Sequence, residues 1–259
     1  MELEVLTMSK AGGRSRNEDA FGVWSNHDAC FCVLSDGAGG HGGGDVASKL
    51  VVKHALSWFQ ETPACNSSAV EAALRAANDA IVAEQKREQE LHDMRATAVV
   101  LAIDTARSEA TWGHLGDSRL YCFRNRRIVA QTRDHSVVQS MVDAGYLPAK
   151  DLRSVPERSK LLAALGDADH FEPSIEPGAF PVFDGDAFLL CTDGMWEYVQ
   201  DDEIEAALVA SLSAEEWLRA LEANVLARGR PGQDNYSAIA VWCSDPHEHT
   251  RPPLSVDEI

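Results

Sequence analysis

Residues 97–132 read TAVVLAIDTARSEATWGHLGDSRLYCFRNRRIVAQT, and this stretch decides the fold class. Runs rich in Val, Ile, Thr and aromatic residues are separated by short polar breaks, which is typical of strands. The predicted strands are 97–104, 109–115, 119–124 and 127–132. Asn125 and Arg126 alone separate the last two, which indicates a tight hairpin turn. Strands that follow one another so directly favour antiparallel pairing, since a parallel pair needs a long crossover connection.

Helical patterns flank this strand-rich centre in pairs. Apolar residues recur at helical spacing in residues 44–59, 67–93, 202–210 and 214–228. Further strands are predicted at 19–24, 29–34, 186–192 and 236–243, and a short helix at 136–144 that ends at Gly145. Strands and helices do not alternate regularly in this order. The pattern therefore predicts an α+β architecture, in which antiparallel sheets are flanked by helix pairs.

Composition limits the possible partners and compartments. The chain has 259 residues, of which 45% are hydrophobic, and this is enough for a real core in one large domain. A net charge of −18 disfavours binding to nucleic acid or to an anionic membrane surface. We see no spanning segment of about 20 apolar residues and no signal peptide, and the six cysteines show no zinc spacing. We therefore expect a cytoplasmic protein with one domain at 1–245 and a polar tail at 246–259.

Acidic residues recur at the ends of the predicted strands. Asp36-Gly37 and Asp193-Gly194 each follow an apolar run. A single Asp-Gly pair is typical of a hairpin turn. A whole set of carboxylates indicates bound cations, because clustered acids repel one another unless cations neutralise them. Oxygen ligands prefer hard ions such as Mg²⁺ and Mn²⁺, so the set predicts a divalent metal centre. Its other members are Glu18, Asp19, Asp117 and Asp234.

These acids belong to a series of motifs that resembles a known family. The motifs are RxxNED (14–19), SDGAGGH (35–41), GDSR (116–119), RDHS (133–136), LLAALG (161–166), CTDG (191–194) and GQDN (232–235). In order and spacing the series resembles the metal-dependent serine/threonine protein phosphatases of the PP2C (PPM) family, in their bacterial form, over about residues 5–243. The resemblance implies a four-layer α/β/β/α sandwich. Two central antiparallel sheets would lie between helix pairs, with the metals at one edge.

The resemblance also implies a metal-binding role for each matching acid. Asp36 would bridge two Mg²⁺ or Mn²⁺ ions, and the carbonyl group of Gly37 would help to hold the first. Asp193 and Asp234 would hold the second ion. Asp117 matches the family position that is linked to a third, weaker metal site.

The remaining roles concern the reaction itself. A water bridging the two ions would attack phosphorus in line, so no protein nucleophile is needed. Glu18 would orient water bound to metal, with Asp19 supporting it, and Arg14 would grip the substrate phosphate with its guanidinium fork. Some members have a histidine where this chain has Ala38. The general acid therefore stays open between metal-bound water and His41.

The implied activity is hydrolysis of phosphoserine and phosphothreonine in proteins. We expect a monomer that opposes a bacterial Hanks-type Ser/Thr kinase by acting on the kinase and its targets, and control of type VI secretion is one setting. Residues 136–160 match the family's flap, which we expect to select substrates. Two alternatives are a non-catalytic binding or sensor module of the same fold and a hydrolase of small phosphorylated metabolites.

Overall fold

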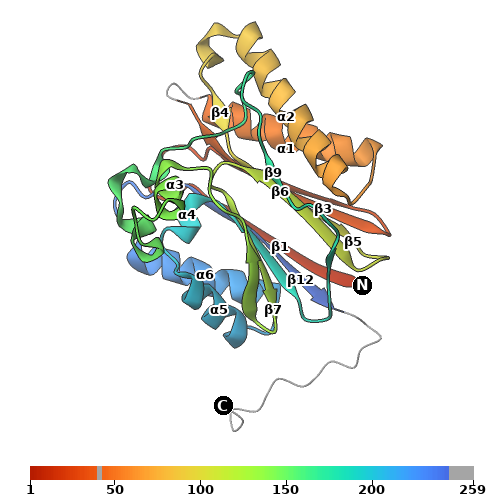
Figure 1. Ribbon diagram of the computed structural model, residues 1–259. Helices are drawn as coiled ribbons and strands as arrows, with labels where there is room; N and C mark the ends of the chain where they lie inside the picture. The colour runs from red at the N-terminus through yellow and green to blue at the C-terminus, as the bar shows by residue number, and fades with distance from the viewer. Residues whose placement is uncertain (40–42, 245–259) are drawn as a thin grey trace.

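Two antiparallel sheets form the centre of the molecule (Figure 1). The computed structural model describes residues 1–39 and 43–244, apart from the side chains of residues 154, 156 and 157. The predicted tail at 246–259 thus lies outside the described residues, as does the last residue of the predicted domain. Sheet A has the strand order β1-β12-β11-β7-β8. Its strands are β1 (Glu2–Lys10), β12 (Tyr236–Ser244), β11 (Ala187–Cys191), β7 (Arg119–Arg124) and β8 (Arg127–Gln131).

Sheet B has the order β10-β6-β5-β3-β2, with two short strands paired beside this path. The main strands are β10 (Phe180–Pro181), β6 (Glu109–Leu115), β5 (Ala98–Asp104), β3 (Ala29–Ala38) and β2 (Asp19–Ser25). The short ones are β4 (Arg95–Ala96), which pairs with β3, and β9 (Ser174–Ile175), which pairs with β6. Every pairing between named strands is antiparallel, as their short connections favour.

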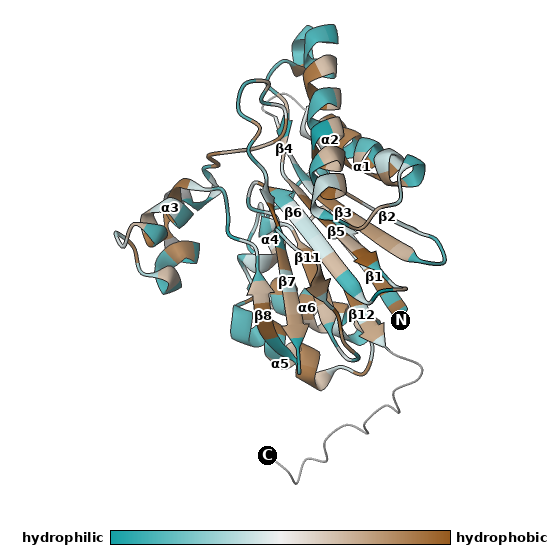
Figure 2. Ribbon diagram, turned by 45° about the vertical axis from the view of Figure 1, so that its right-hand side comes forward, coloured by the Kyte–Doolittle hydropathy of each residue, from teal (hydrophilic) through white to brown (hydrophobic). Residues whose placement is uncertain are grey.

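A pair of helices covers the outer face of each sheet (Figure 1). Sheet B is covered by α1 (Gly44–Glu61) and α2 (Ser67–Arg87), and sheet A by α5 (Asp201–Ala210) and α6 (Ala214–Arg228). Figure 2 shows hydrophobic colour along the strands between the helix layers, while α2 carries both kinds of residue. This order of layers confirms the predicted α/β/β/α sandwich.

Three apolar layers separate the four structural layers. The layer between the sheets includes Leu34, Leu101 and Phe188, all fully buried. Between sheet B and its helices, the rings of Phe31 and Phe59 stack with centroids 4.0 Å apart. Between sheet A and its helices lie the largest buried side chains, which are Trp196 and Trp217. Burying one large apolar side chain stabilises the folded state by about 1.5–3 kcal/mol, so these layers hold the sheets to each other and to their helices.

Strand β1 is the main element that the sequence pattern did not predict. Its nine residues pair along their full length with β12, from Glu2 opposite Ser244 to Lys10 opposite Tyr236. Its apolar residues alternate first as Leu3 and Val5 and then as Leu6 and Met8, so the alternation changes phase within the strand and is hard to recognise. The predicted turn at Asn125 and Arg126 is confirmed, since both residues have positive φ angles of 51° and 61°.

The predicted flap lies at one end of the sandwich, beside α4 (Asp193–Trp196). It contains α3 (Val137–Asp143) and the 3₁₀ turns Ala149–Ser154 and Pro156–Ser159. The chain leaves α3 through Gly145, whose φ of +76° is the left-handed conformation expected after a helix. Among the described residues, no helix is long and apolar enough to cross a membrane.

Candidate active site

The predicted acids gather where strands of both sheets end. In the β2–β3 pair, Asp19 lies directly opposite Asp36. Asp193 is the first residue of α4, which follows β11, and Asp234 lies just before β12. A Cβ atom on Gly194 would lie 1.9 Å from the carbonyl oxygen of Asn235, so only glycine lets these two segments touch. Glycine at this position therefore brings the backbones that carry Asp193 and Asp234 together.

Glu18 and Gly37 converge at the start of α1. The backbone N–H of Glu18 donates to Oδ1 of Asn235 at 2.8 Å, and the N–H of Gly37 donates to the carbonyl oxygen of Glu18 at 3.2 Å. A Cβ atom on Gly44 would lie 2.7 Å from the carbonyl oxygen of Gly37 and 2.8 Å from Oε2 of Glu18. The first turn of α1 thus packs directly against both predicted ligand groups.

Asp117 lies in the turn that passes from β6 in sheet B to β7 in sheet A. Gly116 enters the turn with a φ of +106°, a conformation that suits glycine. The next residue, Ser118, shares a 2.7 Å hydrogen bond between its hydroxyl and that of Thr97. The Thr97 hydroxyl also accepts from the backbone N–H of Asp36 at 3.0 Å. Thr97 therefore ties the Asp117 turn to the strand that presents Asp36.

A buried ion pair supports this turn. The guanidinium group of Arg119 donates to both carboxylate oxygens of Asp134, at 2.8 and 2.7 Å. It also lies 3.6 Å from the centre of the Trp196 ring, and both charged side chains are almost completely buried. A bidentate pair of this kind fixes orientation as well as charge, so it makes a rigid support.

At this end of the sandwich, several ionised carboxylates buried close together are electrostatically unfavourable unless a cation is bound. Burial is the main cause that raises the pKa of Asp36 and of Asp193, and the charges of neighbouring acids raise it further. Burial raises the pKa of Asp19 to about 6 and that of Asp117 to about 7. One carboxylate oxygen each of Asp19 and Asp193 is buried without a hydrogen-bond partner. Such unpaired acceptors are costly to bury, and a bound cation would satisfy them.

The donor set fits hard divalent ions. Carboxylate and backbone carbonyl oxygens are the groups that Mg²⁺ and Mn²⁺ prefer. In residues 1–39 and 43–244, no three His, Cys, Asp or Glu side chains lie close enough together to hold an ion by themselves. The residues that would hold the ions remain the predicted ones, namely Glu18, Asp19, Asp36, Gly37, Asp117, Asp193 and Asp234.

Arg14 lies in an exposed loop at the same end of the molecule. Its Nη2 donates to Oδ2 of Asp234 at 2.9 Å, with about half of each side chain exposed. The predicted phosphate-binding group is thus next to a predicted metal ligand. His41, one of the two candidates for the general acid, lies outside the described residues.

Several residues that position these acids have no role that was predicted from the sequence. Thr192 donates its hydroxyl proton to Oδ2 of Asp19 at 3.0 Å, and Asn235 donates to the carbonyl oxygens of Ala11 and Arg16. Both lie inside the CTDG and GQDN motifs, which was the available signal. Thr97 and Trp196 lie outside the motifs, and only the structure identifies their contacts.

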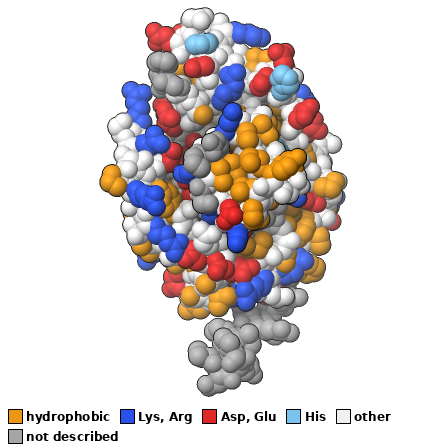
Figure 3. All heavy atoms as spheres, turned by 60° about the vertical axis from the view of Figure 1, so that its left-hand side comes forward, with side chains coloured by type: hydrophobic (Ala, Val, Ile, Leu, Met, Phe, Trp, Pro, Cys, Tyr) orange, Lys and Arg blue, Asp and Glu red, His pale blue; other side chains and the backbone are white. Residues whose placement is uncertain are grey.

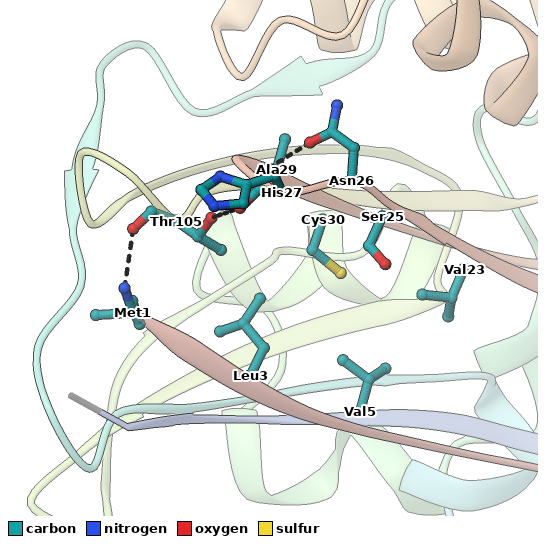
Figure 4. A pocket seen from close by; sticks show the side chains of 10 residues that line it. All are labelled: Met1, Leu3, Val5, Val23, Ser25, Asn26, His27, Ala29, Cys30 and Thr105. Atoms are coloured by element: carbon teal, nitrogen blue, oxygen red, sulfur yellow. Dashed lines mark hydrogen bonds between the residues drawn. The ribbon is translucent and has the colours of Figure 1, made fainter. Parts of the chain in front are cut away.

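A separate hollow of about 390 Å³ opens at the far end of the sheets (Figure 4). It lies between β1 and β2, near the turn that joins β2 to β3. Its lining contains none of the predicted site residues; it consists of Met1, Leu3, Val5, Val23, Ser25, Asn26, His27, Ala29, Cys30 and Thr105. The candidate active site is therefore the carboxylate edge and not this hollow.

Several protein phosphatases are similar to this chain in sequence and in fold. The chain is 34% identical over 244 residues to the serine/threonine protein phosphatase PstP of Mycobacterium tuberculosis, covering 93% of this chain but 45% of PstP. It thus spans about half the length of that relative. It is 32% identical to the serine/threonine phosphatase stp of Listeria welshimeri, with coverage of 88% and 90%.

Solved structures agree with these relatives. The catalytic domain of PstP, in complex with two manganese ions, superposes with a TM-score of 0.79 at 30% identity, covering 94% of this chain and 99% of that one. PppA, described as a key regulatory component of the type VI secretion system in Pseudomonas aeruginosa, gives a TM-score of 0.74 at 29% identity, with coverage of 93% and 97%. The family model described as Protein phosphatase 2C matches residues 9–230. This chain belongs to the protein phosphatase 2C family.

Proposed function

We propose that this chain is a Mg²⁺- or Mn²⁺-dependent phosphatase that hydrolyses phosphoserine and phosphothreonine in proteins. The observation that carries the proposal is the meeting of buried, incompletely paired carboxylates at one end of the sandwich, next to an exposed arginine. The relatives named above, and the manganese ions in one of them, support the same conclusion. Bound divalent ions would supply an activated water and neutralise charge on the phosphoryl group.

Arg14 binds the substrate phosphate in this proposal. One of its amino groups is occupied by Asp234, and the side chain is 54% exposed, so the rest of the guanidinium group faces solvent. A planar guanidinium group can donate two parallel hydrogen bonds to a phosphate. The loop position lets Arg14 approach a phosphate held at the carboxylate edge.

Glu18 orients the attacking water in this proposal, with Asp19 behind it. Burial, together with the neighbouring charges of Asp45 and Asp234, raises the pKa of Glu18, which makes it a better proton acceptor. The hydrogen bond from its own backbone to Asn235 fixes the segment. Asp36, Asp193, Asp234 and the carbonyl group of Gly37 would hold two ions, and Asp117 a third, weaker one.

The physiological setting is part of the proposal. Residues 136–160 border the site and expose Met141 and Tyr146, which suits a flap that selects protein substrates. Figure 3 shows hydrophobic side chains gathered on this face of the molecule. We expect the enzyme to act in the cytoplasm as a monomer, on a bacterial Ser/Thr kinase and its targets. The likeness to PppA supports control of type VI secretion as one such setting.

The test is a phosphatase assay on the purified chain, with p-nitrophenyl phosphate and a phosphothreonine peptide, in Mn²⁺ and in EDTA. We expect metal-dependent hydrolysis that falls by more than about 10²-fold in Asp36→Asn and Asp193→Asn, since each removes a ligand charge from the reacting centre. Asp104→Asn is the matched control, because Asp104 ends β5 at the opposite end of the sheet and caps a turn at Arg107.

Three outcomes would count against this proposal. Folded wild-type protein that hydrolyses neither substrate would support a binding module. Faster turnover of sugar phosphates than of phosphopeptides would support a metabolite hydrolase. Near-normal activity of Asp36→Asn would show that the carboxylate edge is not the active site.

A further inference from the structure

Trp196 contacts three functional parts of the molecule at once. Its Nε1–H donates to the carbonyl oxygen of Asp117 at 2.9 Å. Its ring lies beneath the guanidinium group of Arg119, at 3.6 Å. Its own carbonyl oxygen accepts from Nε of Arg153, a flap residue, at 2.8 Å. Since the side chain is 1% exposed, these contacts are made inside the protein and compete little with water.

The flap is attached to the segment that begins with Trp196. The two amino groups of Arg153 donate to Oε1 of Gln200 at 3.0 Å and to Oδ1 of Asp201 at 2.7 Å. Arg158, further along the flap, donates to both carboxylate oxygens of Glu197. Two flap arginines therefore bind a stretch of six residues, 196–201, which begins at the last residue of α4, three positions after Asp193.

We propose that Trp196 is a positioning residue that couples docking of the flap to the placement of Asp117. The inference rests on the proposed function in one respect, which is that Asp117 serves a cation. Opposite ends of one residue hold the two parts: the indole holds the Asp117 turn, and the backbone carbonyl holds the flap. A shift of α4 that accompanies release of the flap therefore also moves the donor that supports Asp117.

Trp217 provides the contrasting case within the same apolar cluster. It too is fully buried, and its Nε1–H donates to a backbone carbonyl, that of Ile204, at 3.3 Å. That bond joins α6 to α5 and reaches neither the flap nor the carboxylate edge. Trp196→Phe and Trp217→Phe thus remove the same chemical group and the same volume, and only the first removes a link to Asp117.

The first test measures amide hydrogen exchange in the full chain without metal. In Trp196→Phe, and in Arg153→Met on the flap, we expect the amides of residues 116–119 to exchange on the order of threefold to tenfold faster, as for the loss of one net hydrogen bond. Trp217→Phe and Arg127→Met should leave these amides unchanged. Arg127 is a suitable surface control, because it pairs with Glu205 away from the flap. Unchanged exchange in both test variants would overturn the proposal, as would equal acceleration in Trp217→Phe.

The second test titrates Mn²⁺ alone into each protein by calorimetry. We expect Trp196→Phe and Arg153→Met each to weaken the weakest binding step on the order of threefold to tenfold. The double variant should be no weaker than Trp196→Phe alone, because both changes cut one link. Fully additive effects would overturn the coupling. Wild-type protein that binds no Mn²⁺ would refute the proposed function instead, while the exchange result would still test the link between flap and turn.

Discussion

The Asp117 turn and the Arg14 loop lie at the same end of the molecule and are built in opposite ways. Each contains an arginine paired with an aspartate. The Arg119–Asp134 pair is 5% and 2% exposed, whereas the Arg14–Asp234 pair is 54% and 48% exposed. The first pair makes two hydrogen bonds and packs on Trp196, and the second makes one.

Burial and hydrogen bonding limit each arginine to a different role. A buried, bidentate arginine has its donors occupied, and removing it leaves an unpaired charge in the protein interior. An exposed arginine in a single hydrogen bond contributes about 0–1 kcal/mol to stability and is free to exchange partners. We therefore assign Arg119 to the support of the site and Arg14 to the binding of a substrate phosphate.

The largest effect on stability is expected at the Asp117 turn. Arg119→Met should lower the free energy of unfolding by about 3–5 kcal/mol, because it leaves Asp134 buried without its partner, close to Asp117. Urea unfolding of the protein in EDTA measures this change. The double variant Arg119→Met/Asp134→Leu should recover most of the loss, since apolar residues can replace a buried pair. If Arg119→Met is as stable as Arg14→Met, the distinction between the two regions is wrong.

The next largest effect is expected at the Arg14 loop, and it concerns catalytic activity. Arg14→Met should lower kcat/KM on a phosphopeptide by about 10- to 100-fold, because a charge-assisted contact to phosphate is lost. The same change should alter the free energy of unfolding by less than about 0.5 kcal/mol, as for an exposed pair. Arg107→Met, at the opposite end of the sheets, is the control for loss of a surface charge. A stability loss in Arg14→Met without a loss of activity would reverse the assignment.

A further effect is a pH dependence of the stability, caused by a histidine beside the Asp117 turn. His135 accepts from the backbone N–H of Gly116 and stacks on His114, with ring centres 4.6 Å apart. Burial, and then the neighbouring His114, lowers the pKa of His135 to about 4. The unfolded chain, with a histidine pKa near 6.5, binds more protons between these values. This residue therefore makes the protein less stable as the pH falls from about 6.5 to 4.

His135→Gln tests this sign by comparison with the wild type. The stability of the wild type relative to the variant should decline as the pH falls, by a slope of at most about one proton per molecule. Taking the difference cancels the acid Asp117, whose raised pKa acts in the opposite direction. Urea midpoints between pH 7 and 4 provide the measurement. A difference that does not change with pH would show that His135 is not buried in its neutral form.

Most of the secondary structure follows from local pattern. Strands such as Glu109–Leu115 and Arg119–Arg124 begin and end where the apolar runs do, and α6 begins and ends at the predicted residues. Two elements depart from the prediction. Strand β1 is recognised from its pairing with β12, since its apolar alternation changes phase between Val5 and Leu6. Helix α2 begins at Ser67, and Asn66 caps it by accepting from the N–H of Ala69. The helix begins at the predicted residue but ends at Arg87 and not at residue 93, because the backbone of Glu88 is extended, with φ −119° and ψ 104°.

Chemistry was readable from the sequence because the ligand types and the motifs around them are local. An aspartate followed by glycine after an apolar run marks the position of a candidate ligand, although the structure has no sharp turn there, since Asp36 and Gly37 lie within β3 and Asp193 begins α4. That these acids share one edge, with oxygens of Asp19 and Asp193 left unpaired, was a hypothesis until the strands were placed. The assignment of each acid to a particular ion stays a prediction.

The sequence alone determined the residue types at the site, the strands that carry them and the family resemblance, because each is written in a few neighbouring residues. The residues that support the site follow only from the way the sheets pack. Thr97 reaches Asp36 across 61 positions, and Trp196 reaches Asp117 across 79. A hydrogen bond between such distant positions depends on how the two sheets pack and leaves no periodic trace in the chain, so no local pattern could reveal it.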